Sequence, residues 1–323
     1  MILKLVTHIS RIIVGIVFIY SGFVKLVDPI GSQFKFEEYF SESVLDIEFF
    51  IPLALPFSIL LIISELALGV MLLVGYKPKF TVWSLFSLNL IFLFLTWYSY
   101  TYNKVTDCGC FGDAIKLTPK ETFYKNIVFM IFIVILIVGL KNINSVISNK
   151  FAAISSLVSI LVSLLITYYV LNHLPIIDFR AYSVGTDIAS DMQYKDDGEI
   201  PPIHDFMIET DDGDQLESML KKDKAMLVIM YNFEKTDEKG IVPVATVAKK
   251  AKEKGYEIYV LTASYIENQE ASQKEYNLPY PFGFCDETTL KTAVRANPGI
   301  MTVEKGIIAG KWNWKDADDV ILK

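Results

Sequence analysis

The sequence predicts a membrane all-α bundle of four helices with a fifth transmembrane helix, followed by a soluble α/β domain. Three observations support this fold class. Hydrophobic residues make up 52% of the 323 residues and the mean hydropathy is +0.39, above the ~45–50% apolar content of soluble domains. Five apolar runs lie in the first 174 residues. Strand-like and helix-like patterns then alternate in the second half, as in an α/β domain. We therefore expect a bundle at 1–145, a fifth transmembrane helix at 146–174, a linker with peripheral strands at 175–223, and the α/β domain at 224–323.

The two halves differ in charge. Residues 175–323 carry 18 Lys/Arg and 27 Asp/Glu, whereas residues 1–174 carry 12 and 10. Nucleic-acid binding requires a basic surface, so the acidic second half argues against a nucleic-acid partner.

Each of the five apolar runs can form a helix that spans ~30 Å of hydrocarbon, because about 20 residues suffice. Proline is tolerated near a helix start, so Pro52 and Pro56 fit the start of the second run. The predicted spans are Ile9–Val27, Ile51–Tyr76, Phe80–Tyr102, Phe123–Leu140 and Phe151–Asn172.

Basic residues in the short links predict the orientation of the bundle. Lys4 and Arg11 flank the first span, Lys77 and Lys79 join the second to the third, and Lys141 and Lys150 bracket the link from the fourth to the fifth. These links share one side if all five runs cross, and positive residues favour the cytoplasmic side. The acidic 28–50 loop, the 103–122 loop and the soluble half then lie on the opposite side.

The 103–122 loop contains the cysteine motif "DCGCFGD", with Cys108 and Cys110 separated by one glycine. Disulfides form and persist outside the cytoplasm. A disulfide closed over so small a ring is strained and labile, which suits thiol exchange. A structural or intersubunit disulfide is an equally good interpretation. Metal binding is disfavoured, because two cysteines with only carboxylates nearby are a poor zinc set, and we expect no metal site.

Residues 224–323 show the order βαβαβαββα. The predicted strands are 225–232, 256–263, a short one at 280–286, and two at 299–314, and the helices are 242–255, 264–277, 287–297 and a closing helix at 315–323. Ser264 is a candidate N-cap and Gly255 a candidate C-cap. Cys285 is expected to be a small buried apolar residue, with the alternative that it pairs with Cys108 or Cys110.

This order resembles the thioredoxin-like fold, in its peroxiredoxin and membrane-tethered thiol-reductase variant. The resemblance implies that Pro298 precedes the penultimate strand with a cis peptide bond, which X–Pro bonds allow. It also places Lys235 and Glu238 where the family has its Cys-x-x-Cys pair, with Pro243 as the following helix proline. Because neither position is a cysteine, we expect a degenerate domain used for docking.

The bundle resembles the DoxX family and its MauE-like branch. Arg11, Gly22 and Lys25 match the DoxX opening helix, and Glu65, Gly69 and Gly75 match the second helix. Cys108, Cys110, Phe111, Gly112 and Asn126 match the MauE-like branch. MauE-like proteins are associated with the maturation of a disulfide-rich periplasmic enzyme. The fifth span with a tethered domain resembles inner-membrane proteins of Bacteroidota, which implies a bacterial inner membrane and a periplasmic C-terminal domain.

Glu65 is the second candidate site residue, because a carboxylate in mid-membrane costs about 2.5 kcal/mol or more and usually pairs within the bundle. Candidate partners are Arg11, Lys25, Asn89 and Asn126. One interpretation is a polar site for a quinone, proton or small ligand that includes Glu65, Asn89 and Asn126. The other is a hydrogen-bonded lock between helices, to which Arg11 and Lys25 contribute.

Two functions remain open on the sequence alone. In the first, the bundle anchors a degenerate thioredoxin-like domain that recruits a periplasmic or membrane protein partner into an envelope complex. In the second, the bundle is a thiol-disulfide or quinone-linked oxidoreductase module that uses Cys108 and Cys110. Whether the protein is an enzyme depends on which of these holds.

Overall fold

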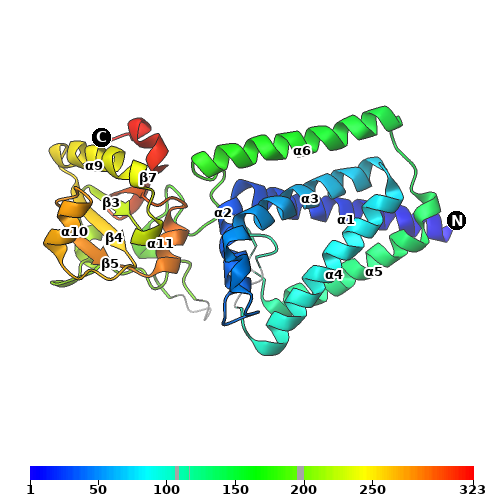
Figure 1. Ribbon diagram of the computed structural model, residues 1–323, viewed down its shortest axis with the longest axis horizontal. Coiled ribbons are helices and arrows are strands. Elements are labelled where there is room, and N and C mark those ends of the chain that lie inside the picture. Colours follow the sequence, from blue (N-terminus) through cyan, green and yellow to red (C-terminus); the bar gives the residue numbers. More distant parts are fainter. Residues whose placement is uncertain (106–108, 116, 195–199) are drawn as a thin grey trace. The chain divides into compact units, whose positions relative to one another are not determined.

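The computed structural model describes residues 1–323 except 106–108, 116 and 195–199. The chain divides into two compact units, Met1–Leu171 and Asn172–Lys323. The first unit is helical, and the second contains a mixed α/β sheet (Figure 1). The predicted fold class is confirmed: five apolar helices come first and an α/β domain follows.

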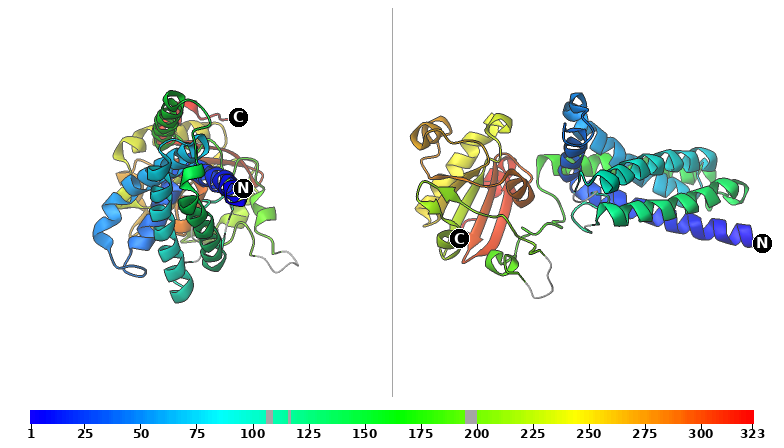
Figure 2. Two further views of the ribbon diagram at one scale, coloured as in Figure 1. Left: turned by 90° about the vertical axis from the view of Figure 1, so that its right-hand side faces the viewer. Right: turned by 90° about the horizontal axis from the view of Figure 1, so that it is seen from below.

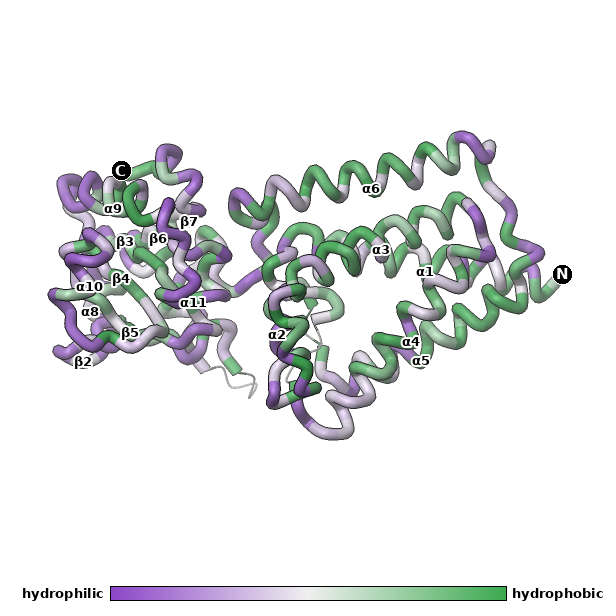
Figure 3. The backbone as a smooth tube through the Cα atoms, in the orientation of Figure 1, coloured by the Kyte–Doolittle hydropathy of each residue, from purple (hydrophilic) through white to green (hydrophobic). Residues whose placement is uncertain are grey.

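Five helices of the described residues are long and apolar enough to cross a membrane, one of them together with the short turn η1 (Glu48–Leu53) that precedes it. Hydrophobic residues run along each of them in Figure 3. Their bounds lie within a few residues of the predicted spans, except that the first begins earlier. They are α1 (Ile2–Val27), α3 (Ala54–Val74), α4 (Pro78–Tyr102), α5 (Pro119–Val138) and α6 (Asn149–Asn172).

Helix α1 packs along α3, and α4 packs along α5. The first contact is close because glycines face the opposite helix. A Cβ added to Gly22 would lie 2.7 Å from Leu66 Cγ, and one added to Gly69 would lie 2.7 Å from Ile19 Cγ1. Small residues that allow backbones to approach are the usual basis of helix association in membranes. The α1–α3 pair is therefore built for side chains that must meet between the two helices.

The 28–50 stretch was predicted to be a loop, and the structure corrects this. Helix α2 (Pro29–Phe40) begins with Asp28, whose Oδ1 accepts from Gly31 N at 3.0 Å, and with Pro29 at its first position. Both residues are standard helix starts. Figures 1 and 2 show α2 lying across the ends of the long helices. Its Phe36 and Phe40 pack against Phe57 of α3.

The second unit contains a seven-stranded sheet of order β2-β1-β5-β4-β3-β6-β7 in the described residues. Strands β3, β4 and β5 are parallel, and β6 and β7 are antiparallel additions. Strand bounds are β1 (Glu209–Thr210), β2 (Gly213–Asp214), β3 (Ala225–Ile229), β4 (Glu257–Thr262), β5 (Phe282–Phe284), β6 (Gly299–Glu304) and β7 (Ile307–Asn313). The helices are α7 (Ile188–Asp191), α8 (Leu216–Leu220), α9 (Glu238–Glu253), α10 (Gln269–Glu275) and α11 (Glu287–Ala293).

Both faces of the sheet are covered, which explains the continuous apolar run of β3. Met226 and Val228 face α9, and Leu227 and Ile229 face the opposite layer with α11. A strand buried on both faces is expected to lack alternation. The central strands are therefore held by two hydrophobic layers.

The segment 175–223, predicted to be a linker with peripheral strands, is part of this folded unit. Its strands β1 and β2 lie at one edge of the sheet. Its apolar side chains Tyr182, Ile203 and Phe206 are buried in the layer beneath the sheet. These residues lie in irregular segments, so their spacing follows neither a helical nor an alternating period. The hydropathy pattern therefore does not predict their burial.

Two helix boundaries also differ from the prediction. The N-cap of α10 is Asn268, whose side chain accepts from Ala271 N at 3.0 Å, while Ser264 Oγ instead accepts from Phe233 N at 2.9 Å. The closing helix is a 3-10 turn, η4 (Trp314–Asp319). Gly255 follows α9 with φ of 84°, as a helix-terminating glycine does. The Asn297–Pro298 peptide bond, directly before β6, is cis.

A buried charge cluster ties the start of the second unit to the sheet. Asp178 bonds to Arg180 Nε at 2.6 Å and to Lys311 of β7. Arg180 Nη1 and Lys311 Nζ also donate to carbonyls at the end of α11. Burial alone would raise the pKa of Asp178, but the charges of Arg180 and Lys311 outweigh it and hold the pKa below its ordinary value. Burial and then Arg180 lower the pKa of Lys311 to about 8.

Asp178→Asn tests this cluster. The substitution leaves two buried cations without their carboxylate, so we expect a loss of about 3–5 kcal/mol in the unfolding free energy of the second unit. Denaturant titration of the full-length protein with limited proteolysis measures it. Because the folded pKa of Asp178 is depressed, its stabilisation is present above about pH 4 and disappears as the pH falls further.

The matched control is Glu217→Gln, which removes the exposed pair with Lys221. This change should cost less than about 1 kcal/mol. Equal effects of the two substitutions would show that the Asp178 cluster does not hold the segment.

Candidate functional site

A buried ion pair joins α1 to α3. Lys25 Nζ lies 2.9 Å from Glu65 Oε2 and 3.1 Å from Oε1. The two side chains are 4% and 1% exposed. Lys25 comes from the last turn of α1 and Glu65 from the middle of α3. Of the four partners predicted for Glu65, the structure selects Lys25.

Ser21 and the cysteine loop complete this network. Lys25 Nζ donates to Ser21 Oγ at 2.6 Å and to the Cys110 carbonyl oxygen at 2.6 Å. Ser21 Oγ lies 3.1 Å from Glu65 Oε2 and 2.8 Å from the Cys110 oxygen. An ammonium has three protons and a hydroxyl has one. Lys25 therefore reaches Glu65, Ser21 and Cys110 together, while the Ser21 proton goes to Glu65 or Cys110.

Sequence reasoning missed Ser21. Its signal is the spacing: Ser21 precedes Lys25 by four residues, so both side chains lie on one face of α1. A serine in an apolar helix usually bonds to its own backbone, which is why the residue type alone attracts no attention. We refer below to Lys25, Glu65, Ser21 and the Cys110 carbonyl as the polar network.

Contacts outside the polar network also hold the cysteine loop against the bundle. Phe111 is buried, its ring centroid lies 5.7 Å from that of Tyr20, and Lys125 Nζ lies 4.4 Å from its centroid. Gly109 has φ of 60°, where a side chain would also meet Lys35 Cγ at 2.8 Å. Glycine is thus required at the centre of Cys-Gly-Cys.

One of the two cysteines of this motif, Cys110, lies within the described residues. Cys110 is a free thiol of intermediate exposure. Cys108, the other member of the predicted redox pair, lies outside the described residues. The geometry therefore places the backbone of one cysteine of the candidate pair in the polar network.

A cavity of about 50 Å³ opens next to Lys25 and Cys110. Phe36, Tyr39, Phe92 and Thr96 also line it. This volume accommodates a small number of water molecules. It is well below the ~300–1,000 Å³ of organic ligand sites, so the cavity as it stands gives no support to a bound quinone.

Asn89 and Asn126 form a separate network. Asn89 Nδ2 donates to the Asn126 carbonyl at 3.1 Å, and Asn126 Nδ2 donates to Thr96 Oγ1 at 3.3 Å. Both asparagines are buried, and these bonds join α4 to α5. Their hydrogen bonds thus go to each other's helix, and Thr96 is the point at which this network reaches the cavity.

Arg11 lies in the N-terminal half of α1 and binds backbone carbonyls. Its guanidinium donates to the carbonyls of Leu72 at 2.7 Å, Leu73 at 2.8 Å and Asn144 at 3.1 Å. The last carbonyls of a helix have no partner within the helix. Arg11 therefore caps the end of α3 and fixes the link before α6, so its role is structural, away from Glu65.

The described residues of the second unit include one cysteine, Cys285, and it is not exposed. Lys235 and Glu238, which the sequence resemblance expects at the positions of a redox pair, are exposed at the end of η3 (Phe233–Lys235) and the start of α9. Cys285 is fully buried beside β5. Burial raises the pKa of the Cys285 thiol to about 12, which leaves almost no thiolate at neutral pH.

Comparison with known proteins supports the assignment of the bundle. Residues 3–139 match the family model of methylamine utilisation protein MauE. The match includes Lys25, Glu65 and Cys110, and the first unit is therefore a MauE-like membrane bundle of the MauE/DoxX type. No curated protein and no solved structure matches the chain.

A double-mutant cycle tests whether Lys25 and Glu65 act as a pair. Lys25→Met and Glu65→Leu each leave a buried polar group without its partner, so each should lower the melting temperature sharply, as a loss of about 3–5 kcal/mol implies. The Lys25→Met/Glu65→Leu double variant should recover part of the lost melting temperature, because no buried charge is then left unpaired. Differential scanning fluorimetry of the full-length protein in detergent measures these changes.

Lys35→Gln is the control, because it removes the partly exposed pair with Glu38 at 2.9 Å. It should shift the melting temperature little. Additive effects of the two single substitutions would contradict the pairing.

Proposed function

We propose that this MauE-like membrane protein exchanges disulfides with an extracytoplasmic thiol protein through Cys108 and Cys110, and that its C-terminal domain docks the partner. The observation that carries the proposal is the pair of hydrogen bonds from Lys25 and Ser21 to the Cys110 carbonyl. The buried ion pair thus also positions the backbone of a cysteine.

The exchange needs no cofactor. A thiolate of the partner attacks one sulfur of a Cys108–Cys110 disulfide and forms a mixed disulfide, and the other cysteine leaves as a thiolate. The second partner thiolate then attacks the mixed disulfide and releases the remaining cysteine. The partner loses two electrons and gains a disulfide, while Cys108 and Cys110 become thiols. The reverse sequence uses the same groups, and access and leaving-group pKa set its rate.

The polar network supports this chemistry by holding the loop. Placing the reacting sulfur in a fixed position lowers the entropic cost of the encounter. The Cys110 amide and carbonyl move with its side chain, so a bond to the carbonyl restricts the sulfur as well. No step of the exchange involves a quinone, because the cavity of about 50 Å³ beside Cys110 is small for a quinone ring.

The C-terminal domain is proposed to be thioredoxin-like and degenerate. The parallel β3–β4 pair with antiparallel β6 and β7 is consistent with that fold. Glu234, Asp237 and Glu238 are exposed around the start of α9, where the redox turn of the fold would lie. Carboxylates at this surface favour a partner with a complementary basic face, since such charges give orientation and specificity.

We place the protein in a bacterial inner membrane, with the N-terminus in the cytoplasm and the C-terminal domain in the periplasm. The basic links at Lys77, Lys79 and Lys141 support this orientation. It puts Cys110 in the compartment where disulfides persist. The MauE-like match is in keeping with a partner among exported proteins that carry disulfides.

A scaffold without thiol chemistry is the second candidate. The observation in its favour is that the domain keeps its folded core while Lys235 and Glu238 replace both thiols. In that case the polar network would only lock α1, α3 and the cysteine loop together.

Thiol trapping in whole cells separates the two candidates. A membrane-impermeant maleimide should label Cys110 after mild reduction, since the loop faces outward. Cys110→Ser, which leaves Cys108 unpaired, should accumulate a mixed disulfide with a partner that reductant releases. Non-reducing electrophoresis detects the adduct.

Cys285→Ser is the matched control, because its thiol is buried and should contribute to neither label nor adduct. Full biological function in a Cys108→Ser/Cys110→Ser double variant would leave only the scaffold. Labelling that requires permeabilised cells would overturn the orientation.

A further inference from the structure

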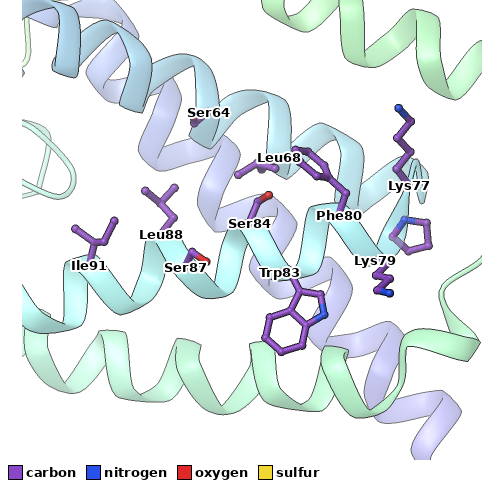
Figure 4. A pocket seen from close by; sticks show the side chains of 11 residues that line it. Ser64, Leu68, Lys77, Lys79, Phe80, Trp83, Ser84, Ser87, Leu88 and Ile91 are labelled. Carbon is purple, nitrogen blue, oxygen red and sulfur yellow. The ribbon is translucent and has the colours of Figure 1, made fainter.

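A second site lies on the outer face of α3 and α4, apart from the polar network. It is a groove of about 900 Å³ (Figure 4), within the ~300–1,000 Å³ range of ligand sites. Lys77 and Lys79 lie at one end, and Phe80, Leu88 and Ile91 form apolar walls. The groove therefore combines a charged end with a long hydrocarbon-like body.

Ser84 and Ser64 line the middle of the groove, and their small side chains leave space there for a ligand (Figure 4). Phe80 is 60% exposed and Ile91 is 55% exposed. Both residues lie on a helix that crosses the membrane, so this face meets lipid and not water. A ligand here must present an apolar chain to the bilayer side.

The charged end of the groove belongs to a strongly basic end of the bundle. Stretches 1–11, 74–81 and 139–151 carry six Lys/Arg and no Asp or Glu. Hydrogen bonds from Arg11 to Leu73 and Asn144, and from Val146 N to the Val74 carbonyl, bring these stretches together. The Asp and Glu residues of residues 1–171 are all elsewhere, at Glu65 or in stretches 28–48 and 107–121.

We propose that this groove binds an anionic glycerophospholipid, with the headgroup at the end that Lys77 and Lys79 line and one acyl chain along Phe80, Leu88 and Ile91. Ammonium groups bind phosphate through charge-assisted hydrogen bonds. Basic sites between helices at the cytoplasmic side are typical places for anionic headgroups. A zwitterionic lipid carries its own cation and gains less from the same lysines.

Native mass spectrometry of the full-length protein in detergent tests this site. Phosphatidylglycerol and phosphatidylcholine with the same acyl chains are titrated separately. Each nearby basic residue contributes roughly a fivefold gain for an anionic lipid, so with two lysines phosphatidylglycerol should bind roughly 25-fold more tightly. Lys77→Gln/Lys79→Gln should reduce its affinity to that of phosphatidylcholine, and Lys77→Arg/Lys79→Arg should retain it.

The matched control is Lys141→Gln/Lys150→Gln, which removes the same charge from the same end of the bundle without touching the groove. It should keep most of the preference. Ser84→Phe, which fills the groove, should weaken both lipids. Equal binding of the two lipids by the wild type, or equal losses in the two double Gln variants, would overturn the site. A second copy of the chain in place of lipid, seen as a dimer that Ser84→Phe disrupts, would also overturn it.

Discussion

The buried pair of Lys25 and Glu65 is the interaction on which the rest of the bundle depends. In a low-dielectric interior, a lone charge costs several kcal/mol, and a pair is tolerated only when its other hydrogen-bonding groups are also satisfied. Lys25 meets this requirement through Ser21 and the Cys110 carbonyl. The pair therefore requires α1, α3 and the cysteine loop to come together in one arrangement.

The close approach of α1 and α3 follows from the same requirement. Gly22 lies one residue after Ser21 and three before Lys25, and its missing side chain lets α3 approach at the level of Glu65 and Leu66. At the C-terminal end of α3, Arg11 donates hydrogen bonds to the last carbonyls of that helix. Two cations of α1 thus fix the same neighbouring helix at two levels, one through a carboxylate and the other through backbone.

The second unit uses a different solution for its buried charges. Asp178 is shared by Arg180 and Lys311, and the cluster is completed by carbonyls at the end of α11. Its effect is to fasten the segment that leads into the sheet, so that the domain begins well before its first central strand. Exposed charges are left at the start of α9, where a partner can reach them.

The sequence was sufficient for the spans, for the order of the central strands along the chain and for Lys25 as one of four candidate partners of Glu65, because hydropathy and the cost of a mid-membrane charge are local properties. It was insufficient for α2, whose polar residues resemble a loop, and for Tyr182 and Phe206, which are buried from irregular chain. Ser21 and the Cys110 carbonyl were out of reach, because a backbone oxygen leaves no mark in a sequence. The sequence therefore allowed candidate site residues to be named, but not the contacts between them to be predicted.

The central claim is that Lys25 positions the cysteine loop, and the reactivity of Cys110 measures this directly. In a Cys108→Ser/Cys285→Ser background, Cys110 is the remaining thiol. The rate of its modification by a maleimide, in the full-length protein in detergent, is compared with and without Lys25→Met. Lys120→Gln, at an exposed lysine in the first turn of α5, is the control. The account predicts a several-fold faster reaction only when Lys25 is lost, because the loop is then released. An unchanged rate in Lys25→Met would contradict it.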